Sequence, residues 1–182
     1  MYIYILIAIV AIIIVFTLVV FNKLVTLSNK LKEAFSTMDV YLKKRWDLIP
    51  NLVETVKGYA KHEQETLESI INLRNGSYND ISDNDKQNVN NEVSGNITKL
   101  MMLAESYPDL KANKNFLDLS NQLTKVEDEI ANSRKYYNAV VMKYNVAVQK
   151  FPDNLIASVF GYHTENMFEI ELSQRENVKV EL

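Results

Sequence analysis

The 182-residue chain contains no cysteine, which excludes disulfide bonds, thiolate metal sites and cysteine nucleophiles. This absence leaves the redox compartment of the protein undetermined. Only four glycines and three prolines are present, a composition that favours long helices joined by few turns. The formal net charge is −3, and the absence of a basic excess argues against nucleic acid as a partner.

Residue patterns that carry chemistry are also missing. The two histidines, His62 and His163, belong to no H-E-x-x-H pair and to no Glu-x-x-His repeat of the kind that binds metals in helical bundles. The sequence has no Gly-x-Ser-x-Gly nucleophile motif and no glycine-rich phosphate loop. We therefore predict no catalytic, cofactor-binding or metal-binding residues, and a protein that is not an enzyme.

The first 21 residues contain no charged side chain. About 20 apolar residues are enough to cross the roughly 30 Å hydrocarbon core of a bilayer. A cleaved signal peptide would need a basic start and a small-residue cleavage site, and neither is present. We predict an uncleaved transmembrane anchor at residues 1–22. Lys23, Lys30 and Lys32 follow the apolar run, so the positive-inside rule places most of the chain in the cytoplasm of a single-pass cell-membrane protein.

The most regular stretch runs from Phe116 to Phe151. Apolar residues recur there with alternating spacings of three and four, and neither proline nor glycine interrupts them. This pattern predicts one long helix with a coiled-coil-like seam. The apolar stripe widens after Lys135, which favours packing against several helices rather than one partner. The seam consists of Phe116, Leu119, Leu123, Val126, Ile130, Ser133, Tyr137, Val140, Tyr144, Ala147 and Phe151.

The other helices are predicted from helical stripes of apolar residues and from residues that end a helix. A helical stripe continues from the anchor to about Asp47, and Pro50 predicts a tight corner at residues 48–51 followed by a second helix to about residue 74. A continuous kinked rod is the alternative. Residues 75–91 are expected to form a loop, 89–107 a third helix closed by Pro108, and Asn113 or its neighbours to cap the long helix.

These elements predict an all-α fold. An N-terminal transmembrane helix (1–22) continues into an antiparallel four-helix bundle (23–151, with the loop at 75–91). Residues 152–182 are expected to hold a short apolar helix at 155–160, stopped by Gly161, and an extended tail with period-two alternation.

Three blocks of sequence resemble the LemA family. They are DVYLKKRWDLIPNLVETVKGYAKHE at 39–63, YPDLKAN at 107–113, and a third block that includes Arg134, Tyr137-Asn138, Tyr144-Asn145 and FPDNLI at 151–156. The resemblance implies a bacterial single-pass membrane protein with an antiparallel helical bundle, and it implies no activity. A related branch of the family is associated with magnetosome membranes, and many members are encoded near membrane metalloproteases.

Two sets of residues are candidates for function. The first is a set of partner or lipid contacts: Lys43, Lys44, Arg45 and Trp46, the chain's basic-aromatic cluster, with Leu155 and Phe160 in the short apolar helix. The second is a polar network that fixes helix register, for which a ligand pocket is the alternative: Asp39, Asp47, Pro50, Asn51, Arg134, Tyr137, Asn138, Tyr144 and Asn145.

Together these observations predict a membrane-anchored scaffold or adaptor that acts by protein–protein contacts with other membrane or cytoplasmic proteins. Homo-oligomerisation stays open. The alternatives are a regulator of a membrane protease or envelope-stress system, which rests on the family resemblance alone, and a membrane-remodelling protein that uses the 155–160 helix. A lid over the open end of the bundle is a further role for that helix.

Overall fold

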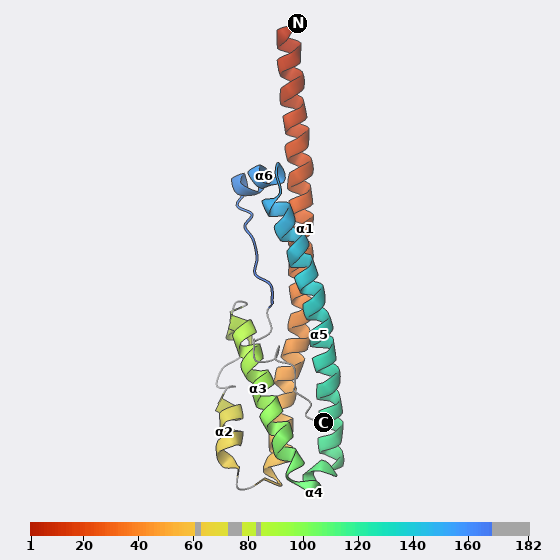
Figure 1. Cartoon of the computed structure of the whole chain (residues 1–182), viewed down its shortest axis with the longest axis vertical. Helices are drawn as coiled ribbons and strands as arrows, with labels where there is room; N and C mark the ends of the chain where they lie inside the picture. Colours follow the sequence, from red (N-terminus) through yellow and green to blue (C-terminus); the bar gives the residue numbers. More distant parts are fainter. Residues whose placement is uncertain (61–62, 73–77, 83–84, 169–182) are drawn as a thin grey trace, which may run out of the picture. The chain divides into compact units, whose positions relative to one another are not determined.

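The fold is known from a computed structural model, which describes residues 1–60, 63–72, 78–82 and 85–168. Its elements are α1 (Tyr2–Lys57), α2 (Gln64–Asn72), the 3-10 helix η1 (Tyr78–Asp80), α3 (Asp85–Glu105), α4 (Pro108–Lys111), α5 (Lys114–Gln149) and α6 (Asp153–Val159) (Figure 1). The described residues contain no strand. The predicted all-α class is confirmed.

Helix α1 continues through Pro50 to Lys57, so the predicted corner at residues 48–51 is wrong and the continuous rod is correct. An interior proline costs a helix about 3 kcal/mol. Beyond it, Leu52, Val53 and Val56 are all buried, and each fully buried side chain of this kind contributes roughly 1.5–3 kcal/mol. The burial of three such residues outweighs the proline, and the helix ends only before Gly58.

The contacts divide the chain into two compact units. The first unit consists of Met1–Thr37 and Ser133–Met167. Its core joins α1 to the second half of α5 and to α6, with Leu24, Ala34 and Val141 completely buried. Figure 1 shows α6 beside α1 at the end of α5, followed by an extended segment.

Within this unit, the apolar first residues of α1 are exposed and do not belong to the core. Residues 1–19 are exposed apart from half-buried Thr17, although nearly all are apolar. The helix has the length and composition needed to cross a membrane. A core helix of a soluble protein would bury such residues, so this exposed surface fits a lipid environment.

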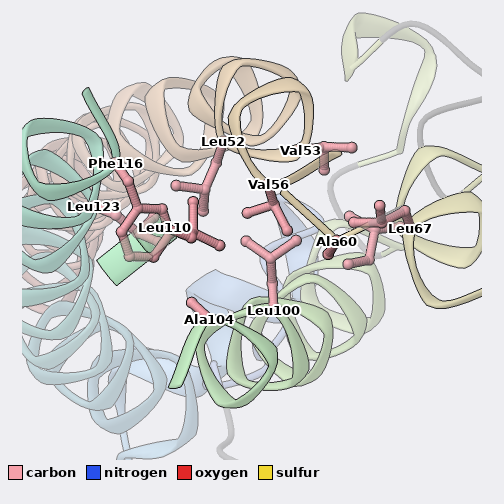
Figure 2. Packing of buried hydrophobic residues seen from close by; sticks show 11 residues of the cluster. Leu52, Val53, Val56, Ala60, Leu67, Leu100, Ala104, Leu110, Phe116 and Leu123 are labelled. Carbon is pink, nitrogen blue, oxygen red and sulfur yellow. The ribbon is translucent and has the colours of Figure 1, made fainter. Parts of the chain in front are cut away.

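The second unit contains residues 38–132 and Phe168 among those described. Figure 2 shows its apolar core, to which α1 contributes Leu52 and Val56, α3 contributes Leu100, and α5 contributes Phe116 and Leu123. Leu110 of the short helix α4 is fully buried in the same cluster.

Several predicted boundaries differ from the structure. The second long helix is divided between the end of α1 and the nine-residue α2, so the antiparallel four-helix bundle is not confirmed. The expected loop at 75–91 is wrong in part, because η1 lies within it and α3 already begins at Asp85. Pro108 closes α3 as predicted, and it is also the first residue of α4.

The C-terminal half follows the sequence more closely. Helix α5 matches the predicted long helix, and Asn113 Oδ1 accepts a hydrogen bond from the Phe116 amide at 3.1 Å, which caps it as expected. Helix α6 matches the short apolar helix, and Gly161 follows it with φ +74°. The chain is extended from 162 to 168, while the alternating tail beyond lies outside the described residues.

Candidate functional site

Arg45 forms the centre of a polar cluster inside the second unit. Its side chain is only 2% exposed, and its guanidinium reaches both α3 and α5. Nη1 donates to Ser94 Oγ at 2.9 Å and to Glu127 Oε1 at 3.1 Å. Nη2 donates to the backbone oxygen of Asn90 at 3.1 Å and to its side-chain Oδ1 at 2.5 Å. One buried cation therefore ties three helices together.

Asp39 takes part in a second cluster, which holds the segment around η1. The hydroxyl of Tyr78 donates to Asp39 Oδ1 at 2.6 Å, and Lys86 Nζ lies 2.9 Å from the same oxygen. The Tyr78 ring lies 5.8 Å from that of Trp46, and the Lys86 ammonium lies 5.2 Å from the Tyr78 ring centre. Tyr78 and Lys86 of the predicted loop are thus held against α1 by the Asp39 carboxylate and the Trp46 indole.

The basic-aromatic cluster at 43–46 does not form one surface. Arg45 and Trp46 are buried, so neither is accessible to a partner or a lipid in this structure, which corrects their prediction as contact residues. Lys43 and Lys44 are exposed, and Lys43 pairs with Asp47 at 2.7 Å, one helical turn away. Arg45 and Trp46 are buried because helical spacing places them on the buried stripe of α1.

The polar residues of α5 bind the extended segment that follows α6. The Asn145 side chain makes two hydrogen bonds with the backbone of Glu165, donating to its oxygen at 2.8 Å and accepting from its amide at 2.9 Å. The Tyr137 hydroxyl donates to the backbone oxygen of Asn166 at 3.3 Å. The amide of Asn145 therefore pairs with an extended backbone as a neighbouring strand would.

Tyr144 is buried beside this segment. Burial raises the pKa of its phenol, and the negative charge of Glu165 and the nearby Tyr162 raise it further. These causes disfavour the charged form, so the phenol of Tyr144 stays neutral at physiological pH.

The members of the predicted network whose partners are known lie in different local sets. Asp39 belongs to the Tyr78 cluster, and Asp47 to the exposed pair with Lys43. The side chain of Asn51 is exposed, and its backbone oxygen accepts from Thr55 Oγ1 at 2.7 Å. Three other members are half-buried, namely Pro50 in α1 and Arg134 and Asn138 in α5.

One pocket lies between α1, α2 and α3 of the second unit. Its lining is apolar except for Asn96 and includes Trp46, Ile70 and Ile97. A ligand site would need several convergent polar groups. In the part of the chain that the structure describes, no three His, Asp or Glu side chains converge as metal ligands would. The clusters described above can stabilise the packing of helices and can provide surfaces for binding.

Leu155 and Phe160 are both exposed, as is Val159 between them. Sequence reasoning missed Val159 and the neighbouring Phe151, which are more exposed than either candidate. It also missed Asn90, Ser94 and Glu127 as partners of Arg45, since they lie far from it in the sequence.

Comparisons with known proteins identify relatives of this chain. The family model described as "LemA family" matches residues 34–182. Protein LemA of Metamycoplasma hominis is 26% identical over 158 residues, which is 86% of this chain and 72% of that protein. Magnetosome protein MamQ 2 of Paramagnetospirillum magneticum is 31% identical over 71 residues, 39% of this chain and 26% of the relative. Magnetosome protein MamQ of Magnetospirillum gryphiswaldense is 31% identical over 70 residues, 38% of this chain and 26% of the relative.

Proposed function

Since this chain belongs to the LemA family, we propose that it is a membrane-anchored helical scaffold without catalytic activity. The span holds the helical part at the cytoplasmic face of a cell membrane, and partners bind to its side. The observation that carries this proposal is the contrast within α1. Residues 1–19 expose apolar side chains, whereas Leu24, Met38 and Val56 of the same helix are completely buried.

A tethered scaffold acts through effective concentration, because a partner that binds it is confined to a thin layer next to the membrane. The exposed surface of α5 offers such a contact. Met142 and Val146 are exposed one helical turn apart, with exposed Ala139 beside them. Exposed Lys44 on α1, which belongs to the second unit, is a separate candidate contact. A contiguous group of exposed apolar side chains marks an interaction site, whereas single ones are common on any protein surface.

The names of the magnetosome relatives do not supply the role of this chain. The shared segment is only about a quarter of each MamQ protein, so a magnetosome function would rest on parts that the match does not cover.

Photocrosslinking in living cells tests the proposal. A photoreactive amino acid replaces Met142 in one full-length variant and Lys44 in a second. Lys135, an exposed polar residue of α5, is the matched control position. The proposal expects discrete crosslinked bands with defined membrane or cytoplasmic proteins from Met142 or Lys44 and fewer from Lys135. Equal labelling of the most abundant membrane proteins from all three positions would contradict a scaffold role.

A further inference from the structure

Helix α6 and Phe151, two residues before it, expose an unusual amount of apolar surface. Phe151 is 73% exposed, Leu155 57% and Val159 77%. Leu155 and Val159 lie one turn apart and therefore share a face of α6. On the other side, Ile156 and Ala157 pack into the core of the first unit. The helix is attached to the protein by one face and presents a second apolar face outward.

The position of α6 along α1 is fixed by several contacts. The Phe160 ring lies 4.8 Å from that of Phe21, and the Tyr162 ring lies 6.4 Å from it. Lys23 Nζ donates to Asp153 Oδ2 at 2.6 Å. These contacts lie where the apolar run of α1 ends and the first polar residues follow.

The length of the exposed apolar run gives the depth of α6 in a bilayer. Tyr2–Val19 is exposed except at Thr17, whereas the next residue, Val20, is 4% exposed and packs in the same cluster as Ala157. At 1.5 Å per residue the run measures about 27 Å. The hydrocarbon core is about 30 Å thick. Protein therefore begins to cover α1 at the depth where the acyl chains end, and the covering element includes α6.

We propose that α6 is an interfacial helix, which buries Phe151, Leu155 and Val159 at the boundary between acyl chains and headgroups of the leaflet where α1 emerges. Continuity with the span identifies lipid as the occupant, because the apolar face lies at the same depth as the lipid-facing end of α1. Tyr162 lies there with the rings of Phe21 and Phe160, and tyrosine is enriched at membrane interfaces.

The charges around α6 suit this location. Asp153 is the only charged residue within α6, and it is buried and paired with Lys23. No uncompensated acid of the helix therefore repels anionic headgroups, and exposed Lys150 adds a positive charge beside Phe151.

The depth of a spin label tests the proposal directly, and the natural lack of cysteine makes single-cysteine variants simple. Full-length protein carrying V159C is reconstituted in mixed phosphatidylcholine–phosphatidylglycerol vesicles. The collision rates of the label with oxygen and with a water-soluble nickel complex are then measured. I12C within the span and K135C on the exposed side of α5 are the controls.

The label at residue 159 should show an oxygen-to-nickel ratio several-fold above that at residue 135 and below that at residue 12. A ratio equal to that at residue 135 would overturn the proposal. Low access to both reagents would also overturn it, since this result would mean that protein covers the face.

A second variant separates insertion from folding. L155D changes an exposed residue, so the helical content and the ratio at residue 12 should stay the same. The contacts to α1 keep α6 in place, but the aspartate draws water to the apolar face, so the ratio at residue 159 should fall. An unchanged ratio at residue 159 in L155D would show that residues 155 and 159 do not share one lipid environment, and would equally overturn the proposal.

Discussion

The buried guanidinium of Arg45 gives the sharpest prediction about stability. Its charge is balanced by the carboxylate of Glu127 at 3.1 Å, while Asn90 and Ser94 supply neutral acceptors. Removing one partner of a buried ion pair costs about 3–5 kcal/mol. The side chain of Glu127 is 37% exposed, so water partly solvates the pair and lowers the expected cost. We predict that Glu127→Ala destabilises the second unit by about 1–3 kcal/mol.

The measurement is urea unfolding of full-length protein in detergent micelles, followed by circular dichroism. Glu129→Ala is the matched control, because it removes the same carboxylate from an exposed position two residues away. Its effect should stay within about 0.5 kcal/mol. Hydrogen exchange of α3 gives a local reading, since α3 carries Asn90 and Ser94 and should exchange faster only in Glu127→Ala.

A double-mutant cycle with Arg45→Met tests whether Arg45 and Glu127 stabilise the protein as a pair. Without the guanidinium, Glu127 has no cation to balance, so Glu127→Ala should then cost less than about 0.5 kcal/mol. An equal cost of Glu127→Ala with and without Arg45 would show that the pair contributes nothing. The stability of this region would then have to come from its apolar core alone.

Three further predictions concern α1 and α5. Pro50→Ala should stabilise the protein by about 1–3 kcal/mol, because α1 runs through this position and regains a backbone donor; a lower unfolding midpoint would contradict a continuous helix. Asn145→Leu removes both hydrogen bonds to Glu165 and should speed hydrogen exchange of the Glu165 amide, whereas Lys143→Leu at an exposed position should leave it unchanged. The folded pKa of Tyr144 lies above its ordinary value near 10, so its stabilising contribution is complete below about pH 10 and is lost as the pH rises toward the folded pKa. Tyr144→Phe should therefore weaken the alkaline loss of unfolding free energy, and an identical pH profile would count against it.

Long periodic patterns predicted this fold well. The apolar run at the N-terminus, the extent of α5 and the cap at Asn113 all agree with the structure, because each depends on local spacing or on a short-range hydrogen bond. The stop at Gly161 belongs to the same class, since its positive φ is a local property of the backbone.

Pro50 shows where local rules fail. The residue favours a helix end on its own, and the outcome was decided by the burial of Leu52, Val53 and Val56 against α3, α4 and α5. That packing energy comes from segments distant in the sequence. The helical spacing of apolar residues continues on both sides of Pro50, at Ile49, Leu52, Val53 and Val56. Following this spacing past the proline would have predicted a continuous helix.

The candidate sites were harder to predict for a similar reason. Charge and aromaticity at 43–46 looked like a surface, yet the three-to-four spacing from Leu42 to Ile49 places Arg45 and Trp46 on the buried stripe. The bridge from Asn145 to Glu165 joins a helix to an extended segment, and no periodic pattern records such a contact.

Cysteine accessibility along α1 tests the central claim. The claim is that the apolar start of α1 lies in a bilayer and holds the rest of the chain at one face of the membrane. Single cysteines replace Ile5, Ile12, Val19, Asn29 and Ser36 of the cysteine-free chain, and a membrane-impermeant maleimide is applied to intact and to opened cells. The first three positions should resist labelling in both, and the last two should react only after the cells are opened. Labelling of residues 12 and 19 as readily as residue 36 in opened cells would contradict the claim.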